Sequence, residues 1–164
     1  MKTAVVYYSM DGSTKEAAVQ IAQRVGAPVF ELEEVKKRSG KPMSFMAAAF
    51  GALIGKKSKL KENPAKILAD YDVIYLGSPI WASRTVPAIN TFLSQLNAAG
   101  KQIIFFTLQA DPNPLPPEGL NKLIRRLEQE GASATRVIRL HGDKPGAAAS
   151  PTHIKEQLKK ILAE

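Results

Sequence analysis

Two kinds of segment alternate along this chain, and that alternation limits the folds it can adopt. Short runs rich in β-branched and aromatic residues are separated by longer runs with apolar residues at three- and four-residue steps. The strand-like runs are Lys2–Ser9, Pro28–Leu32, Tyr71–Gly77, Gln102–Thr107 and Ala134–Leu140, and the helix-like runs are Ser13–Val25, Val86–Ala98 (ended by Gly100), Pro117–Gly131 and Thr152–Leu162. Strands joined by helical crossovers pair in parallel, so the sequence predicts an α/β fold with a three-layer, doubly wound, five-stranded parallel sheet.

The length and composition favour one domain over residues 1–164. Hydrophobic residues make up 45% of the chain and charged residues 23%, which is ordinary for a globular protein. The sequence contains no cysteine, which excludes disulfides, thiolate metal sites and a cysteine nucleophile. The N-terminus lacks the pattern of a signal peptide, and no run reaches the roughly 20 apolar residues of a membrane span. We therefore expect a cytoplasmic protein.

The net charge of +8 is concentrated in one segment. Residues 35–61 contain eight basic residues and no acidic one, whereas the rest of the chain is balanced. No aromatic residues interleave with these charges, so nucleic acid is not the expected partner. The centre of the segment, Met43–Ile54, is almost wholly apolar and has helical spacing. The insert 36–61 is expected to pack as a helix over the sheet edge; the alternative is a surface that meets an anionic membrane, a second copy of the chain or a hydrophobic substrate.

The segment Ser9–Thr14, "SMDGST", connects the first predicted strand to the first predicted helix. Ligands of doubly wound sheets bind beyond the carboxyl ends of the strands, and a helix N-terminus offers amide donors to a phosphate. An alternative reading is a capping box, with Ser13 as N-cap and Glu16 three residues later. The two readings are compatible. Asp11 is unfavourable beside a phosphate unless its carboxylate points away or is hydrogen-bonded.

The only tryptophan of the chain, Trp81, follows the third predicted strand. A loop position is costly for an indole unless its face is covered. An aromatic plane next to a phosphate-binding loop suits a flat ring that carries a phosphate tail, although packing of Trp81 beneath a neighbouring loop is the alternative.

Together, these two loops resemble those of the flavodoxin-like family. The family's first loop reads roughly Y-S-x-T-G-x-T-x-x-x-A, and its second reads roughly G-x-P-x-W-x-x-x-x-x-P. The matching residues here are Tyr8, Ser9, Gly12, Thr14, Ala18, Gly77, Pro79, Trp81 and Pro87. The resemblance implies the strand order 2-1-3-4-5 and a noncovalently bound FMN.

The same resemblance implies a role for each of three loops. Residues of the first loop would hold the phosphate, those of the second would line the isoalloxazine ring, and those of the third would offer N–H groups to its pyrimidine edge. These residues are Ser9, Met10, Asp11, Gly12, Ser13 and Thr14; Pro79, Ile80, Trp81 and Ala82; and Leu108, Gln109 and Ala110. Two departures from the family pattern are Asp11, which replaces a threonine, and the third loop's prolines at positions 112, 114, 116 and 117, which have no N–H to donate.

The expected function is an FMN flavoprotein in electron transfer, in which the cofactor supplies the redox chemistry and no catalytic side chain is required. An NAD(P)H- or quinone-linked oxidoreductase is the enzymatic form of this expectation. Its partner would be a redox protein or a small-molecule acceptor, and contact with a membrane or a homodimer partner would involve residues 36–61. The alternative is an adaptor of the same fold that has lost its flavin. His141 and His153 are isolated in sequence without metal-ligand spacing, and Arg84 either offsets negative charge at the flavin or is a solvated loop residue.

Overall fold

The computed structural model describes residues 1–36, 56–80, 84–109, 118–142 and 149–162. Its centre is a five-stranded sheet of order β2-β1-β3-β4-β5, in which all neighbouring strands are parallel. The strands are β1 (Thr3–Tyr7), β2 (Val29–Glu31), β3 (Val73–Pro79), β4 (Gln102–Gln109) and β5 (Ala134–His141). The predicted fold class and strand order are confirmed.

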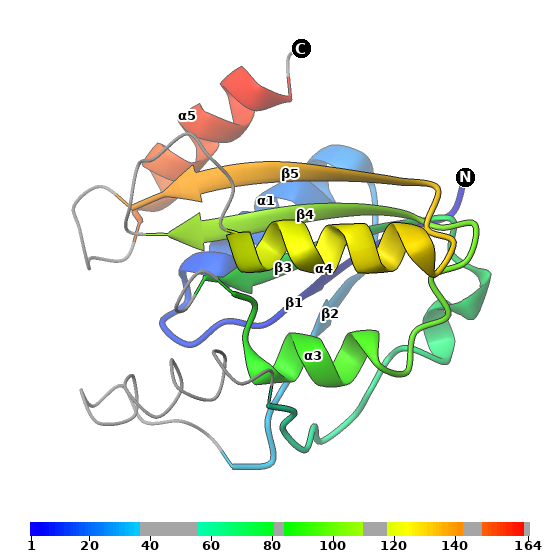
Figure 1. The fold of residues 1–164 in the computed structure, drawn as a ribbon. Coiled ribbons are helices and arrows are strands. Elements are labelled where there is room, and N and C mark those ends of the chain that lie inside the picture. The colour runs from blue at the N-terminus through cyan, green and yellow to red at the C-terminus, as the bar shows by residue number, and fades with distance from the viewer. Residues whose placement is uncertain (37–55, 81–83, 110–117, 143–148, 163–164) are drawn as a thin grey trace.

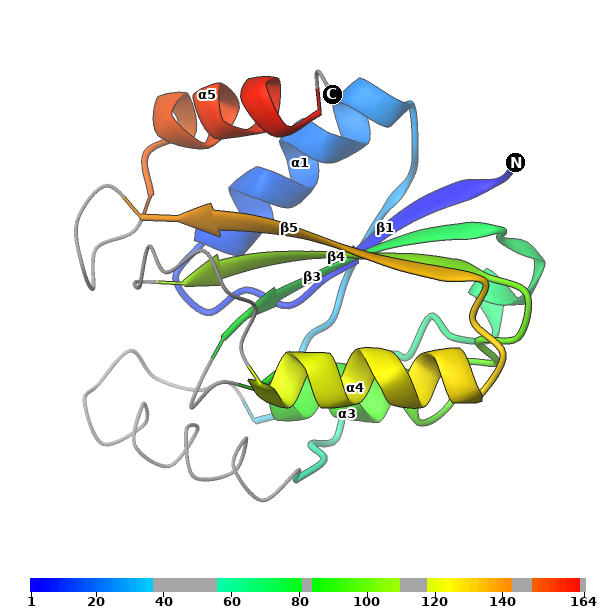
Figure 2. The ribbon, with the colours of Figure 1, turned by 45° about the horizontal axis from the view of Figure 1, so that its top comes forward.

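Helices cover both faces of the sheet, so the structure has three layers (Figure 1). One face carries α1 (Ser13–Val25) and α5 (Pro151–Ile161), and the other carries α3 (Pro87–Leu93) and α4 (Glu118–Gln129), as Figure 2 shows. A short 3₁₀ helix, η1 (Ile67–Asp70), precedes β3. The helix-covered faces explain why the strands read as continuous apolar runs.

Successive residues of the central strands enter different cores. In β4, Ile103 and Phe105 pack towards α3 and α4, whereas Ile104 and Phe106 pack towards α1 and α5. Both phenylalanines are fully buried. Burying a large apolar side chain stabilises the fold by about 1.5–3 kcal/mol, so the two cores fix the sheet firmly beneath its loops.

The second predicted helix is shorter than its apolar spacing indicates. We predicted a helix from Val86 to Ala98 ended by Gly100, but α3 ends at Leu93. Beyond α3, the side chain of Asn97 accepts a hydrogen bond from the backbone N–H of Ala99 at 3.1 Å, a local bond that competes with helix formation. Gly100, with φ of 72°, belongs to the turn into β4 instead.

The chain segments that lead into and out of the basic insert pair with each other. Glu34 and Leu60 form an isolated antiparallel bridge, and the N–H of Val35 donates to the carbonyl of Lys59 at 2.9 Å. The helix predicted at Met43–Ile54 lies outside the described residues. Among the described residues, no helix is long and apolar enough to cross a bilayer.

Candidate functional site

The loop between β1 and α1 is folded by two short hydrogen bonds. The N–H of Gly12 donates to Ser9 Oγ at 3.0 Å, and the N–H of Ser13 donates to Asp11 Oδ1 at 2.9 Å. Gly12 has φ of 96°, a conformation that glycine adopts without strain. The loop therefore turns sharply and directs the first turn of α1 towards the carboxyl edge of the sheet.

The predicted capping box at this helix is wrong. Gly12 is the N-cap of α1, and Ser13 is the first helical residue. The carboxylate of Glu16 accepts a hydrogen bond from Gln20 Nε2 at 2.7 Å and so interacts further along the helix. The Asp11 carboxylate instead accepts from the amide of Ser13, two residues on, in an Asx-turn bond just before the helix.

Several polar groups of this loop remain available to a ligand. The hydroxyl of Ser13 is buried and has no hydrogen-bond partner among the described residues. The amides of Thr14 and Lys15 have no acceptor among the described residues, as is usual in the first turn of a helix. A Cβ on Gly12 would meet no atom within 4 Å, so the space beside the loop is open. These groups fit an anion such as a phosphate.

The ends of β1, β3 and β4 lie side by side at the same edge. Tyr7 pairs with Gly77, and Pro79 pairs with Leu108. The N–H of Ile80 donates to the carbonyl of Leu108 at 3.2 Å, which extends the pairing of β3 and β4 past Pro79. The structure thus brings the first predicted loop next to the start of the second, at the point where the strand order reverses.

The third predicted loop begins later than the sequence indicates. Leu108 and Gln109 were expected in the loop but belong to β4, where they pair with Leu140 and His141 of β5. The hydrophobic pattern ends at the polar Thr107, and that polarity obscured the two further residues. Trp81, Ala82 and Ala110 lie outside the described residues, as do the prolines between residues 111 and 117.

Two buried hydroxyls under this edge were missed by the sequence analysis. Ser78 and Thr107 are paired neighbours on β3 and β4, and both are fully buried. Ser78 Oγ donates to the carbonyl of Pro79 at 2.7 Å, while Thr107 Oγ1 has no hydrogen-bond partner in the part of the chain that the structure describes. Their only signal in the sequence is a hydroxyl residue at the end of each apolar run.

The other side of the loop is acidic. A pocket of about 340 Å³ at the ends of β1 and β2 is lined by Tyr8, Ser9, Met10, Lys15, Leu32 and three glutamates, Glu31, Glu33 and Glu34. The Tyr8 hydroxyl donates to Glu34 at 2.9 Å, and the Tyr7 hydroxyl donates to Glu31 at 2.7 Å. Burial, followed by the bond to Glu31, raises the pKa of Tyr7. Three carboxylates disfavour an anion on this side, so a phosphate fits better on the side of the loop that faces β3.

The two histidines are neighbours rather than isolated surface residues. His141 ends β5 and His153 lies in α5, and their ring centroids are 5.2 Å apart in an edge-to-face arrangement. Within the described ranges, no group of three or more His, Asp or Glu residues is placed to hold a metal ion. Arg84 lines a separate cleft between α3 and α4.

Comparison with known proteins agrees with this geometry. A model of the flavodoxin family matches residues 2–113, so this chain belongs to the flavodoxin family. Among solved structures, a candidate flavoprotein from Bacteroides uniformis is 24% identical, with a TM-score of 0.67 and coverage of 96% of this chain and 97% of that one. A flavoprotein from Lactobacillus acidophilus, solved in complex with FMN, is 23% identical, with a TM-score of 0.58 and coverage of 85% and 91%.

Oxidised flavodoxin 1 from Bacillus cereus is 18% identical, with a TM-score of 0.54 and coverage of 100% of this chain and 99% of that one. No curated protein matches the sequence. The family predicted from the two loop motifs is confirmed, and the structural likenesses confirm the fold. Family and fold together support the predicted class, a flavin-binding redox protein with FMN as its cofactor.

Proposed function

We propose that this protein binds FMN noncovalently beyond the ends of β1, β3 and β4 and serves in electron transfer. The observation that carries the proposal is the buried hydroxyl of Ser13, which has no partner within the described ranges, beside the open amides of the first turn of α1. A buried hydroxyl without a partner costs free energy, and a phosphate oxygen would satisfy it. The flavodoxin family match and the relative crystallised with FMN support the same cofactor.

The cofactor and the chain would have separate roles. When bound, FMN supplies the redox chemistry, and the chain's residues bind and orient it. Residues 9–14 would hold the phosphate, residues 79–82 would line the ring, and residues 108–110 would lie at its polar edge. No side chain is assigned as a general acid or base.

We propose more specifically that the protein is an oxidoreductase that uses NAD(P)H or a quinone. The alternative is an electron carrier that binds a redox protein. The basic insert 36–61 favours an acceptor that is hydrophobic or a surface that is anionic. A homodimer through this insert and a cytoplasmic location remain predictions.

One observation favours a second candidate, an adaptor of this fold that has lost flavin. Asp11 Oδ1 accepts the hydrogen bond of the Ser13 amide, and its carboxylate places a negative charge at the phosphate loop. A phosphate would have to displace or tolerate this carboxylate, at a cost that falls with solvent exposure. Asp11 is exposed, so the cost is modest and the flavoprotein remains the better supported function.

Titration with FMN followed by anaerobic reduction tests the proposal. Purified protein is expected to be yellow, or to bind added FMN with quenching of flavin fluorescence, and then to accept electrons from dithionite. Reduction by NADH or NADPH would distinguish an enzyme from a carrier. Colourless protein that leaves the fluorescence of added FMN unchanged would support the adaptor.

A further inference from the structure

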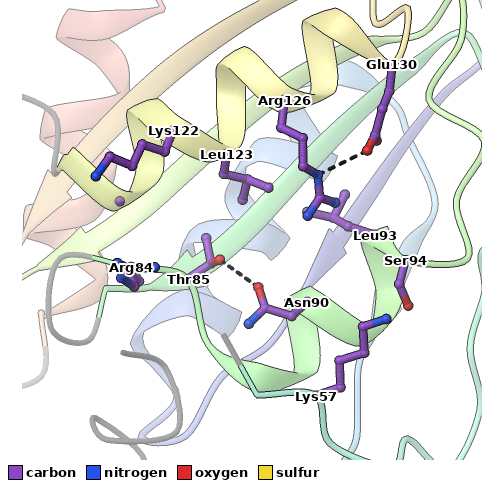
Figure 3. Close-up of a pocket in the computed structure, with 11 residues that line it drawn as sticks. Lys57, Arg84, Thr85, Asn90, Leu93, Ser94, Lys122, Leu123, Arg126 and Glu130 are labelled. Carbon is purple, nitrogen blue, oxygen red and sulfur yellow. Dashed lines mark hydrogen bonds and ion pairs between the residues drawn. The ribbon is translucent and has the colours of Figure 1, made fainter. Parts of the chain in front are cut away.

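A basic cleft of about 470 Å³ lies between α3 and α4, away from the acidic pocket at β1 and β2. Figure 3 shows its lining side chains. Four cationic residues line it, namely Lys57, Arg84, Lys122 and Arg126, and the single acidic lining residue is Glu130. Leu93 and Leu123 supply an apolar part of the wall. The cleft therefore combines excess positive charge with an apolar surface.

The cations come from separate segments that the fold holds in place. The Thr85 hydroxyl donates to Asn90 Oδ1 at 3.2 Å, and Asn90 Nδ2 donates to the carbonyl of Lys56 at 3.1 Å. On the other side of Lys57, the N–H of Ser58 donates to the hydroxyl of Thr91 at 3.0 Å. These bonds fasten the segment around Lys57 to α3, opposite the basic side chains of α4.

Much of this positive charge is available to a ligand. Lys122 pairs with Glu118 at 2.8 Å and Arg126 pairs with Glu130 at 3.1 Å, but about half or more of each of these side chains is exposed. Exposed pairs of this kind contribute little to stability, so an anionic ligand can replace them. Neither Lys57 nor Arg84 forms an ion pair within the described ranges. Arg84 is close enough to Glu118 to help lower the pKa of that carboxyl, after the larger effect of Lys122.

The position of the cleft relates it to the proposed flavin site. Arg84 lies at its wall, and one residue of the chain, Ser83, separates it from residues 79–82, which are proposed to line the flavin ring. The end of the cleft that Arg84 lines is therefore close in sequence to the loop proposed to bind the ring. A molecule with a phosphorylated end and a redox-active end would suit this arrangement.

We propose that the cleft binds the phosphorylated adenosine end of a nicotinamide dinucleotide, with preference for the 2′-phosphorylated form. Converging lysine and arginine side chains suit phosphate groups, and the two leucines suit the sugar and base. The hollow shape favours a small ligand over the flatter surface of an acidic protein. The role of this ligand as an electron donor rests on the proposed function. The anion-binding site itself does not depend on flavin.

Calorimetric titration of the full chain with 2′,5′-ADP, with and without saturating FMN, tests the site. The probe is expected to bind in the micromolar range with either form of the protein, and AMP is expected to bind at least about tenfold more weakly. The double variant Lys57→Gln, Arg84→Gln should weaken binding by about tenfold or more. Arg24→Gln, which removes one positive charge from α1 at the other face of the sheet, should leave the affinity unchanged.

Lys122→Gln provides a second variant should the double variant not fold, and it too should weaken binding severalfold. Absence of binding, equal affinity in the cleft variants and the wild type, or loss of probe binding on addition of FMN would each overturn the proposal. Binding of an acidic protein at the cleft without binding of the probe would overturn it as well. Probe binding to protein that takes up no FMN would leave the cleft established and contradict the proposed function instead.

Discussion

Ser13 is the residue whose chemistry most directly separates a structural loop from a binding loop. Its hydroxyl is buried and bonds to none of the residues that the structure describes. A polar group in that position is costly, and the cost is recovered only if a ligand supplies an acceptor or donor. Its role can therefore be tested independently of stability.

Ser13→Ala is expected to leave the free energy of unfolding of the flavin-free protein unchanged or to raise it by about 1 kcal/mol, because it removes a buried hydroxyl that has no partner among the described residues. It should weaken FMN binding by about tenfold, because one hydrogen bond to the phosphate is lost. Urea denaturation and flavin fluorescence titration measure the two effects. Ser133→Ala, an exposed serine that precedes β5 at the opposite end of the sheet, is the matched control. A loss of stability without loss of FMN affinity would show that the hydroxyl serves the fold alone.

Asp11 is expected to oppose FMN binding through its charge. Asp11→Asn keeps an oxygen that can accept from the Ser13 amide but removes the negative charge. FMN affinity should rise by about three- to tenfold at low ionic strength, and the gain should shrink as salt screens the interaction. Asp70→Asn in η1 makes the same change far from the loop and should have no effect. An unchanged affinity in Asp11→Asn would show that the carboxylate points away from the bound phosphate.

At this scale, the sequence predicts some roles and misses others for identifiable reasons. The glycine and hydroxyls of the first loop were predictable because their residue types suit a phosphate. The interaction of Asp11 with the Ser13 amide was not, because a serine followed by Glu16 satisfies the same capping pattern. The contact between His141 and His153 joins residues of different elements, so no local pattern could reveal it.

At the scale of elements, β3 and β4 are held together by a fit between a glycine and an aromatic ring. A Cβ at Gly77 would overlap the ring of Phe106, which is fully buried in the core beneath α1 and α5. The absence of a side chain at position 77 is therefore a packing requirement at the very edge where the ligand is proposed to bind.

Gly77→Ala should destabilise the fold by about 1–3 kcal/mol, as overpacked cores do. Chemical denaturation monitored by circular dichroism measures the change. The double variant Gly77→Ala, Phe106→Leu should recover part of the loss relative to the sum of the single variants, because a smaller side chain leaves room for the methyl group. Strict additivity of the two substitutions would contradict the proposed overlap.

The free energy of unfolding is expected to depend on pH in the alkaline range because of Tyr7 in β1, which is buried and hydrogen-bonded to Glu31 of β2. Burial raises the pKa of Tyr7 in the folded state above the value of about 10 expected for an unfolded chain. Its stabilising contribution is thus fully present below about pH 10 and is lost as the pH rises towards the folded-state pKa, because the unfolded state releases the proton first.

Tyr7→Phe should therefore cost about 1 kcal/mol near neutral pH. The difference in unfolding free energy between wild type and variant should shrink as the pH rises beyond about 10. Denaturation at a series of pH values measures this difference and cancels the titration of groups common to both proteins. A constant difference across that range would show that the hydroxyl titrates alike in the folded and unfolded states.

The boundaries of elements were less predictable than their order. The apolar spacing of residues 86–98 is helical, but the side chain of Asn97 bonds locally and α3 stops at Leu93. Conversely, β4 continues through Leu108 and Gln109 because β5 is long enough to pair with them. In both cases, tertiary or side-chain hydrogen bonds determine where the element ends, which the apolar periodicity alone does not.

At the scale of the whole molecule, the alternation of strands and helices was sufficient to predict the three-layer sheet, since parallel strands need crossovers. The order β2-β1-β3-β4-β5 came from the resemblance of the loop motifs to flavodoxins and is confirmed by the structure. The acidic pocket and the basic cleft were not predicted, because each gathers residues from elements far apart in the chain.

These two features give the molecule an uneven charge distribution around the carboxyl edge of the sheet. Carboxylates lie beside the phosphate loop on the β2 side, and lysines and arginines lie between the helices of the opposite layer. Such an arrangement is expected to favour anionic ligands on the β3 and β4 side of the loop. It agrees with an FMN phosphate held at α1 and a ring lying across the ends of β3 and β4.

The most direct test of this account compares FMN with riboflavin, which has the same ring and no phosphate, by calorimetric titration of the full chain. If the loop from Ser9 to Thr14 holds the phosphate, FMN should bind at least about a hundredfold more tightly than riboflavin, since a phosphate bound by several amides and hydroxyls contributes more than about 3 kcal/mol. Equal affinity for the two molecules, or no binding of either, would contradict the account.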